Sequence, residues 1–318
     1  MDASSQGVAR ELSLLKGKDL ISSADFQMEQ INALFNLSIQ LKKEERRIDL
    51  GNRVLGLIFS KASTRTRVSF QVAMARLGGQ VVDLSLQATQ IGRGEPVKDT
   101  ARVLSRYCDA LAIRTYSHEE LIEYANWASI PVINALTDLE HPCQALADFL
   151  TIKETFGKLK GLTLAYIGDG NNVSNSLILL GAILGVHLRV ACPSGFEPSA
   201  WVVEKARSLA SFDSTLQILN EPVEAVRGAN AIYTDVWASM GQEKEQQERK
   251  EIFKKFTVDE NLFCEASQEA IVLHCLPAHR GEEITDELIE SKASKIFHQA
   301  ENRLHIQQAL LASLLGGL

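Results

Sequence analysis

Short apolar runs alternate along this chain with longer stretches whose apolar residues recur at helical spacing. The short runs are typical of buried strands, and strands separated by helices indicate a parallel sheet. In the first half the runs are VLGLIF (54–59), QVVDLS (80–85), DALAIR (109–114) and PVINA (131–135). In the second half they are TLAYIG (163–168), HLRVAC (187–192), LQILN (216–220), NAIYTD (230–235) and AIVLHC (270–275).

The alternation is interrupted at the lysine- and glycine-rich connection Gly157–Gly161 and then resumes. We therefore predict an α/β fold with two doubly wound parallel-sheet domains, at residues 1–142 and 143–318, joined by interdomain helices. The bridging helix is expected over 143–156. The last helix, at about 302–315, is expected to pack back on the first domain.

Helical spacing of apolar residues also predicts the other helices, which are expected over 8–15, 25–43, 64–77, 97–107 and 118–127. The stretch 242–255 consists mostly of charged residues and glutamine. It is most simply interpreted as a solvated helix on the surface.

The composition of the 318 residues excludes several classes of protein. Forty acidic and 33 basic residues give a formal net charge of −7, so no basic field attracts nucleic acid or an anionic membrane. The N-terminus has no apolar signal region, and no apolar stretch is long enough to span a bilayer. Five scattered cysteines without CxxC spacing argue against a disulfide framework or a structural zinc site. We expect a cytoplasmic protein that binds anions only locally.

Open α/β sheets bind ligands beyond the carboxyl ends of their strands, so the polar residues that follow each run are the candidates for function. The first run is followed by Ser63-Thr64-Arg65-Thr66-Arg67 at the start of a helix. If Ser63 is the N-cap, the next amides, two hydroxyls and two guanidinium groups can hold a phosphate. The alternative is an ordinary capped helix with solvated arginines.

Two further groups lie at the same predicted edge of the first sheet. Arg114 ends the third run, and His141-Pro142-Cys143-Gln144 follows the fourth. A histidine and an arginine there can polarise a carbonyl oxygen on which negative charge develops. A histidine before proline is also common as a structural turn residue, which is the alternative interpretation.

In the second half, Gly168-Asp169-Gly170-Asn171-Asn172-Val173 begins like a dinucleotide-binding turn. Val173 stands where the third glycine should be, and no acidic residue ends the next strand, so that interpretation fails. The turn instead presents two asparagines, which suit an amino-acid backbone or serve the turn alone. Asp235 ends a strand where a carboxylate can attract an ammonium group, and Cys275 ends the last run.

Four separated motifs together resemble the aspartate/ornithine carbamoyltransferase family, and most closely its ornithine-specific members. In chain order they are Ser63-Thr64-Arg65-Thr66-Arg67, His141-Pro142-Cys143-Gln144, Asp235 with Ser239-Met240-Gly241, and His274-Cys275-Leu276-Pro277. The resemblance covers both predicted domains.

The resemblance implies transfer of the carbamoyl group of carbamoyl phosphate to the side-chain amine of L-ornithine, giving L-citrulline and phosphate in arginine metabolism. Both the biosynthetic and the degradative direction use this chemistry, with arginine biosynthesis as the expected role. It implies a carbamoyl phosphate site formed by Ser63, Thr64, Arg65, Thr66, Gln90, Arg114, His141, Gln144, Cys275, Leu276 and Arg303. The implied ornithine site contains Asn172, Asp235, Ser239 and Met240. The implied catalytic residues are Cys275, Arg114 and His141, and Cys275 with the Leu276 carbonyl receives the attacking amine.

The resemblance also implies a homotrimer or a multiple of trimers, in which Gln90 reaches into a neighbouring subunit's site. The reaction needs an electrophilic carbonyl, a stabilised oxyanion, cations for the phosphate and a neutral amine. We therefore expect no cofactor and no metal.

Four alternatives to ornithine transfer remain at this stage. If aspartate were the acceptor, its second carboxylate would need additional cations in the site, whereas this chain offers the acidic Asp235 there. Putrescine lacks a carboxylate and acetylornithine lacks the α-ammonium, and transferases for either could share much of this sequence. A catalytically silent metabolite-binding relative would be expected to lose Arg65, His141 or Cys275, and all three are present.

Overall fold

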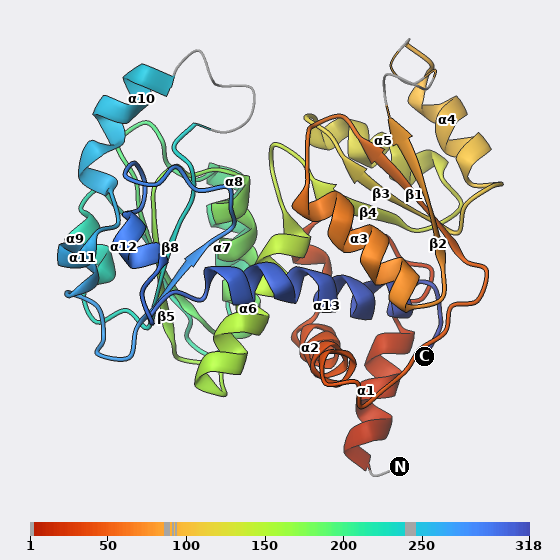
Figure 1. Ribbon diagram of the computed structural model, residues 1–318, viewed down its shortest axis with the longest axis horizontal. Helices are drawn as coiled ribbons and strands as arrows, with labels where there is room; N and C mark the ends of the chain where they lie inside the picture. Colours follow the sequence, from red (N-terminus) through yellow and green to blue (C-terminus); the bar gives the residue numbers. More distant parts are fainter. Residues whose placement is uncertain (1–2, 86–89, 91, 93, 239–245) are drawn as a thin grey trace. The chain divides into compact units, whose positions relative to one another are not determined.

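The computed structural model describes residues 3–85, 90, 92, 94–238 and 246–318, and the chain forms two compact units (Figure 1). Unit 1 consists of Met1–Leu146 and Arg303–Leu318, and unit 2 consists of Ala147–Asn302. The chain passes from one unit to the other within two helices, α6 (Pro142–Phe156) and α13 (Ile296–Leu314). The C-terminal part of α13 therefore belongs to unit 1.

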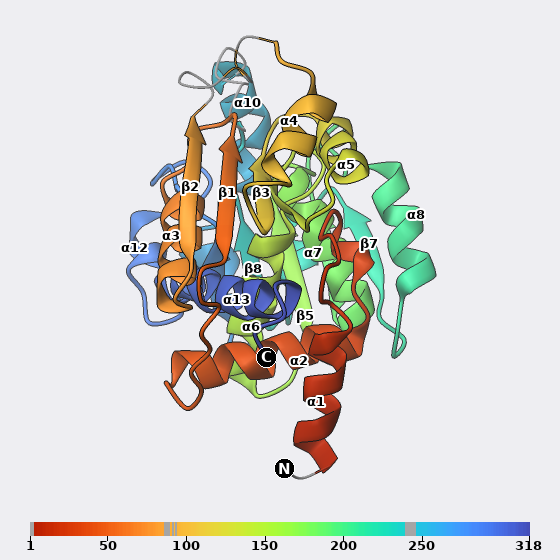
Figure 2. The ribbon, with the colours of Figure 1, turned by 90° about the vertical axis from the view of Figure 1, so that its right-hand side faces the viewer.

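Unit 1 contains a four-stranded parallel sheet with the order β2-β1-β3-β4. Its strands are β1 (Val54–Phe59), β2 (Gln80–Ser85), β3 (Ala110–Arg114) and β4 (Val132–Leu136). Figure 2 shows β1 and the edge strand β2 side by side. Phe59 at the end of β1 is opposite Arg114 at the end of β3, so the carboxyl ends of these strands meet at one edge. All four predicted strands of this half are confirmed.

Five helices accompany this sheet along the chain: α1 (Ala3–Ser13), α2 (Met28–Lys42), α3 (Arg65–Arg76), α4 (Val97–Leu104) and α5 (His118–Trp127). Helices α4 and α5 bury Ala101, Leu121 and Tyr124 against Ile58 and Ile113 of the sheet. Apolar residues at helical spacing supply this buried face, which is why the pattern predicted these elements.

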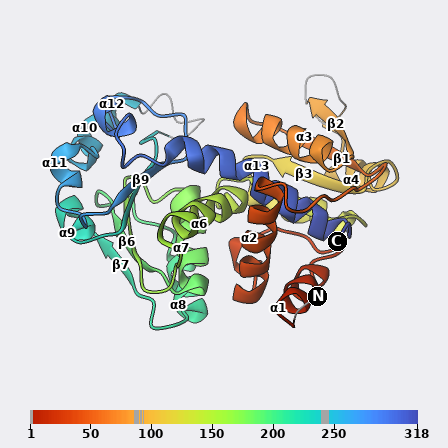
Figure 3. The same cartoon turned by 60° about the horizontal axis from the view of Figure 1, so that its bottom comes forward.

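Unit 2 contains a five-stranded parallel sheet with the order β7-β6-β5-β8-β9. The strands are β5 (Thr163–Ile167), β6 (His187–Ala191), β7 (Leu216–Leu219), β8 (Ala231–Thr234) and β9 (Ile271–His274). The helices are α7 (Asn172–Leu184), α8 (Ala200–Leu209), α9 (Pro222–Val226), α10 (Gln246–Phe253), α11 (Glu260–Phe263) and α12 (Asp286–Ile289). Figure 3 shows α7 and α8 side by side. The predicted fold class and all nine strands are confirmed.

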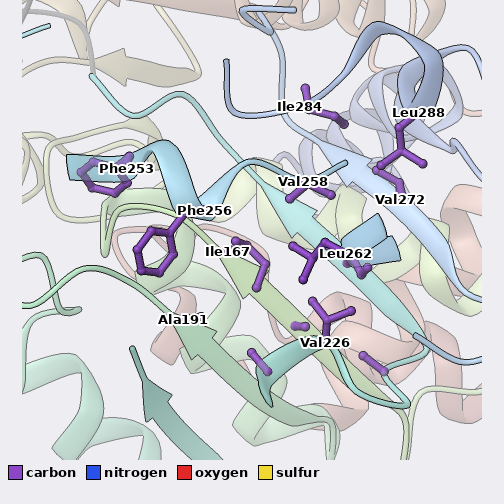
Figure 4. Packing of buried hydrophobic residues seen from close by; sticks show 14 of the residues in the cluster. Ile167, Ala191, Val226, Phe253, Phe256, Val258, Leu262, Val272, Ile284 and Leu288 are labelled. Carbon is purple, nitrogen blue, oxygen red and sulfur yellow. The ribbon is translucent and has the colours of Figure 1, made fainter. Parts of the chain in front are cut away.

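The charged stretch 242–255 is not simply a solvated helix. Residues 242–245 lie outside the described part, and α10 presents Phe253 to the core with no exposed area. Figure 4 shows Phe253 and Phe256 with Ile167 of β5 among the buried apolar residues of unit 2. The helix is confirmed by α10, and most of its described residues are exposed. The interpretation as a wholly solvated helix was wrong, because Arg249 and Phe253 form a buried face together with Phe256, which follows the stretch.

Helix α13 begins at Ile296, six residues before the predicted start at 302. Its first turns bury polar groups: Gln299 donates to Asp148 at 2.6 Å and Asn302 donates to Thr151 at 2.9 Å. Ile296 packs in the apolar core of unit 2, and these buried hydrogen bonds hold the turns that follow it. Apolar spacing alone could not reveal turns that are held by polar side chains. Among the helices in the described ranges, none is both long and apolar enough to cross a membrane.

Candidate active site

The predicted phosphate cradle lies at the start of α3 in unit 1. The Ser63 Oγ accepts the N–H of Thr66 at 3.3 Å, and Thr64 already has helical backbone angles (φ −81°, ψ −56°). Ser63 therefore caps this turn, although regular helix begins at Arg65. Thr64 and Arg65 are exposed, so this positive helix end can meet an anion from solvent.

Arg303 brings together residues from three helices of unit 1. Its guanidinium donates to the Gln144 Oε1 at 2.5 Å and to the Thr66 Oγ1 at 3.0 Å. Arg303 is only 3% exposed, and Thr66 and Gln144 are each 2% exposed. Three residues predicted for one site, from α3, α6 and α13, thus form one buried cationic cluster.

His141 and Arg114 belong to the same cluster. Both are buried, and Arg114 ends β3 while His141 immediately precedes α6. Burial lowers the pKa of His141 well below its ordinary value, and the charges of Arg303, Arg114 and Arg65 lower it further. The imidazole is therefore neutral at physiological pH and can donate a hydrogen bond to an oxygen without bringing a charge of its own.

Lys61 is a further cation near this cluster that the motifs did not single out. It is 9% exposed, and its ammonium lies 4.1 Å from the centroid of the Tyr116 ring. Burial and the charge of Arg114 lower the pKa of Lys61, while Asp138 opposes the shift. Its place in the loop between β1 and Ser63 was the available signal, because polar residues after a strand are candidates for function.

For three of the predicted site residues, the structure describes no contact with the other predicted site residues. Gln90 is exposed, and its carbonyl accepts the N–H of Glu95 at 3.2 Å. Ser239 and Met240 lie outside the described residues. The roles assigned to these three residues stay predictions.

Asp235 is the centre of a second cluster, in unit 2. Its Oδ1 accepts the backbone N–H of Val236 at 2.8 Å and the Cys275 thiol at 2.9 Å. Its Oδ2 accepts the side-chain amide of Asn171 at 2.7 Å. A carboxylate offers about four lone-pair positions, and these described donors use three of them. The acidic group is thus fixed in place by three donors.

Asn171 contacts Asp235, whereas Asn172 was the residue predicted to bind the amino acid. The Asn171 Oδ1 caps α7 by accepting the N–H groups of Val173 and Ser174, and Asn172 is the first residue of that helix. The binding role of the half-buried Asn172 stays a prediction.

Arg249 holds the turn that precedes Asn171. Its guanidinium donates to the Asp169 carboxylate at 2.8 Å and to the Trp237 carbonyl at 2.7 Å. Burial raises the pKa of Asp169, although Arg249 acts in the opposite direction. Gly170 is required in this turn, because a Cβ there would lie 2.3 Å from the Pro198 nitrogen.

The motif His274-Cys275-Leu276-Pro277 follows β9. The His274 Nδ1 accepts the Leu276 N–H at 2.8 Å, and its Nε2 lies 3.1 Å from the Glu283 Oε1. Potential ligand atoms of Asp235, His274 and Cys275 lie within 4.8 Å of one another. Both ring nitrogens of His274 already have protein partners, so these three residues fit a hydrogen-bonded network better than a metal centre.

Sequence reasoning missed three residues that organise these clusters, Lys61, Arg249 and Glu283. It noted Asn171 as one of the two asparagines of its turn but did not predict the contact with Asp235. Only Arg249 had a periodic signal, because Arg249, Phe253 and Phe256 are spaced by four and three residues, which places them on one helical face. The partner of Glu283 is nine residues away across a loop, where no period applies.

Comparison with known proteins was consistent across both units. Residues 18–154 match the carbamoyl-P binding domain of the aspartate/ornithine carbamoyltransferases, and residues 160–314 match their Asp/Orn binding domain. The chain is 69% identical over 318 residues to an ornithine carbamoyltransferase of Prochlorococcus marinus, with complete coverage of both chains. It is 56% identical over 305 residues to one from a Nostoc species, covering 96% of this chain and 99% of that protein.

Solved structures agree. The crystal structure of ornithine carbamoyltransferase from Gloeobacter violaceus is 54% identical, with a TM-score of 0.87 and coverage of 95% of this chain and 99% of that one. The ornithine carbamoyltransferase structure from Pyrococcus furiosus is 48% identical, with a TM-score of 0.92 and coverage of 96% and 99%. The chain therefore belongs to the aspartate/ornithine carbamoyltransferase family.

Proposed function

We propose that this protein transfers the carbamoyl group of carbamoyl phosphate to the side-chain amine of L-ornithine, giving L-citrulline and phosphate. The observation that carries the proposal is the cluster of Arg303, Thr66, Gln144, His141 and Arg114, which suits a small dianion with an electrophilic carbonyl. The names of the similar proteins support ornithine as the acceptor.

The phosphate of carbamoyl phosphate binds at the start of α3 in this proposal. Ser63, Thr64 and Thr66 supply hydroxyls and backbone amides. Arg65, Arg114 and Arg303 supply guanidinium groups whose planar forks can each donate two hydrogen bonds. The same cations stabilise the charge that grows on the phosphate as it leaves.

The carbamoyl group lies beside His141, Gln144 and Thr66. A neutral imidazole and fixed neighbouring cations stabilise the oxyanion that forms when the amine attacks, because they are already oriented before the reaction. His141 is suited to this role because burial and the surrounding arginines keep it from taking up a second proton. The neutral imidazole avoids a further positive charge in a site that already holds several.

Ornithine binds through Asp235, which orients the α-ammonium, with Asn172, Ser239 and Met240 as the other proposed contacts. Its side-chain amine has a pKa near the lysine value of about 10.4 in water, so most of it must lose a proton before it can attack. Cys275 and the Leu276 carbonyl hold the reacting nitrogen. The Cys275 thiol already donates to Asp235, which fixes its position beside the proposed ammonium site.

We further propose a trimer, or a multiple of trimers, with Gln90 at a neighbouring subunit's site. Strand β2 is an edge strand, and Val82 on β2 and Val68 on α3 are 45% and 50% exposed. Apolar side chains on an exposed sheet edge favour contact with another chain. A cytoplasmic location and a role in arginine biosynthesis complete the proposal, and the odd, scattered cysteines support a reducing compartment.

The test is a product assay with purified protein, carbamoyl phosphate and one amine at a time: ornithine, acetylornithine, putrescine, lysine or aspartate. We expect citrulline from ornithine at a kcat/KM at least about tenfold above that of any other amine, since a single charged contact is worth about that much. A faster reaction with another amine, or no ureido product with any of them, would contradict the proposal.

A further inference from the structure

His274 and Glu283 form a buried polar pair beside the proposed amine-binding residues. His274 is 1% exposed and Glu283 has no exposed area. The two side chains meet at 3.1 Å, from the end of β9 and from the segment before α12. The removal of polar groups from water costs free energy unless they form hydrogen bonds, so the complete burial of this pair calls for a physical explanation.

The hydrogen bonds of His274 assign its proton. Its Nδ1 accepts the backbone N–H of Leu276 at 2.8 Å, so that nitrogen carries no hydrogen. The proton of the neutral ring is therefore on Nε2, which donates to the Glu283 Oε1. With both nitrogens engaged, the ring is fixed in orientation and is poorly placed to carry protons to or from a substrate.

Glu283 closes the loop that contains Cys275 and Leu276. The same Oε1 that accepts from His274 also accepts the backbone N–H of His279 at 2.6 Å. The next residue, Ile284, is fully buried in the apolar core of unit 2 and is labelled in Figure 4. One carboxylate thus links the beginning and the end of the loop to a rigid part of the fold.

The loop needs such support because Leu276 has a left-handed backbone conformation, with φ of +58°. Residues other than glycine rarely adopt it, and they keep it only where the surroundings hold them. Its N–H is held by His274. This hydrogen bond holds the peptide group between Cys275 and Leu276, and together with the backbone angles of Leu276 it helps to set the direction of the Leu276 carbonyl.

We infer that His274 and Glu283 are a positioning pair, which aims the Leu276 carbonyl and the neighbouring Cys275 at the amine of ornithine. Neither side chain is expected to touch a substrate. The inference rests on the proposed function, since it concerns the residues that we assign to the attacking amine. A displacement of about 1 Å at such a site can reduce the rate about 100-fold.

Two matched pairs of variants distinguish the effect of the hydrogen bonds from the effect of side-chain packing. His274→Asn retains an acceptor near the Nδ1 position, whereas His274→Leu has a similar shape and no acceptor. Glu283→Gln retains an acceptor for both N–H donors, whereas Glu283→Met fills similar volume without one. Glu282→Met is the control, because Glu282 is the adjacent carboxylate and pairs with Lys250 at the surface at 2.7 Å.

We expect His274→Leu and Glu283→Met to lower kcat about 10- to 100-fold, and each polar counterpart to stay within about fivefold of the unchanged protein. The dissociation constant of carbamoyl phosphate, measured by calorimetry without ornithine, should change less than about threefold, because its phosphate is held by residues of unit 1. Glu282→Met should leave kcat unchanged.

The inference is overturned if the polar and apolar members of each pair lose activity equally, or if kcat follows only the fraction of folded protein. Should one apolar variant fail to fold, the other pair decides: equal kcat values within it also overturn the inference. The activity of the unchanged protein distinguishes a failure of the proposed function from a failure of the positioning role. If it forms no citrulline, the proposed function fails, whereas normal citrulline formation with no difference within the pairs refutes only the positioning role.

Discussion

Arg303 is the residue whose replacement tests the carbamoyl phosphate site most directly. Arg303→Met keeps most of the side-chain volume and removes the guanidinium that contacts Thr66 and Gln144. A hydrogen bond to a charged group contributes about 1.5–3 kcal/mol. The loss of one such bond to the phosphate should therefore raise the dissociation constant of carbamoyl phosphate about 10- to 150-fold.

The same replacement should change how the stability of the folded protein depends on pH. His141 has a folded-state pKa below its unfolded value, so below a pH of about 6.5 the unfolded chain takes up a proton that the folded chain does not. This histidine therefore reduces stability as the pH falls through that value. Of the charges that lower its pKa, Arg303 is the largest. In Arg303→Met the pKa should rise, so the total loss of stability that this histidine causes on acidification should become smaller.

Calorimetric titration with carbamoyl phosphate and urea unfolding at a series of decreasing pH values measure both effects. Arg53→Met is the matched control, because the Arg53 side chain is in the same unit, 51% exposed and paired with Asp109 at 2.5 Å. We expect this control to bind carbamoyl phosphate normally. An Arg303→Met protein that is folded and binds carbamoyl phosphate as tightly as the unchanged protein would refute the assignment of Arg303 to the site.

Three more outcomes follow from the proposed sites. Asp235→Asn should raise the KM for ornithine at least about tenfold and the KM for carbamoyl phosphate far less. Steady-state kinetics with each substrate varied in turn measures both values, and an unchanged KM for ornithine would disprove the ammonium contact. Arg249→Met should lower the free energy of unfolding in urea by about 3 kcal/mol, and the double variant with Asp169→Asn should recover part of this loss. If the losses of the two single variants simply add in the double variant, the two side chains are not coupled. Mixed Arg65→Ala and Gln90→Ala subunits should regain activity after exchange, and proven hybrid trimers without recovery would contradict a shared site.

The predictable part of the site is the part that follows strands. Arg114, Asp235 and Cys275 were singled out because parallel strands end at one edge of a sheet, and each lies at or just after a strand end. The nine strands themselves were predictable from apolar runs between helical stretches. Both inferences work because they use only local sequence and one property of parallel sheets.

Other parts of the site depend on contacts that local sequence does not encode. Arg303 meets Thr66 across 237 residues, and only the resemblance to a family connected them beforehand. Arg249 was hidden in a charged stretch, because nearly all its neighbours face solvent while it pairs with Asp169. The spacing of Arg249 from Phe253 and Phe256 indicates a shared helix face, but local sequence does not identify Asp169, 80 residues away, as its partner.

The residues that hold the site in shape are therefore of a different kind from those proposed to meet the substrate. Cys275 and Asp235 lie where a rule about strands places them, but Asn171 fixes Asp235 and Glu283 supports the loop of Cys275 through hydrogen bonds from loops. Loops have no periodic pattern from which such a partner can be inferred. Because a misplaced Leu276 or Cys275 would hold the amine in the wrong direction, we expect the supporting residues to affect kcat nearly as strongly as the groups they position.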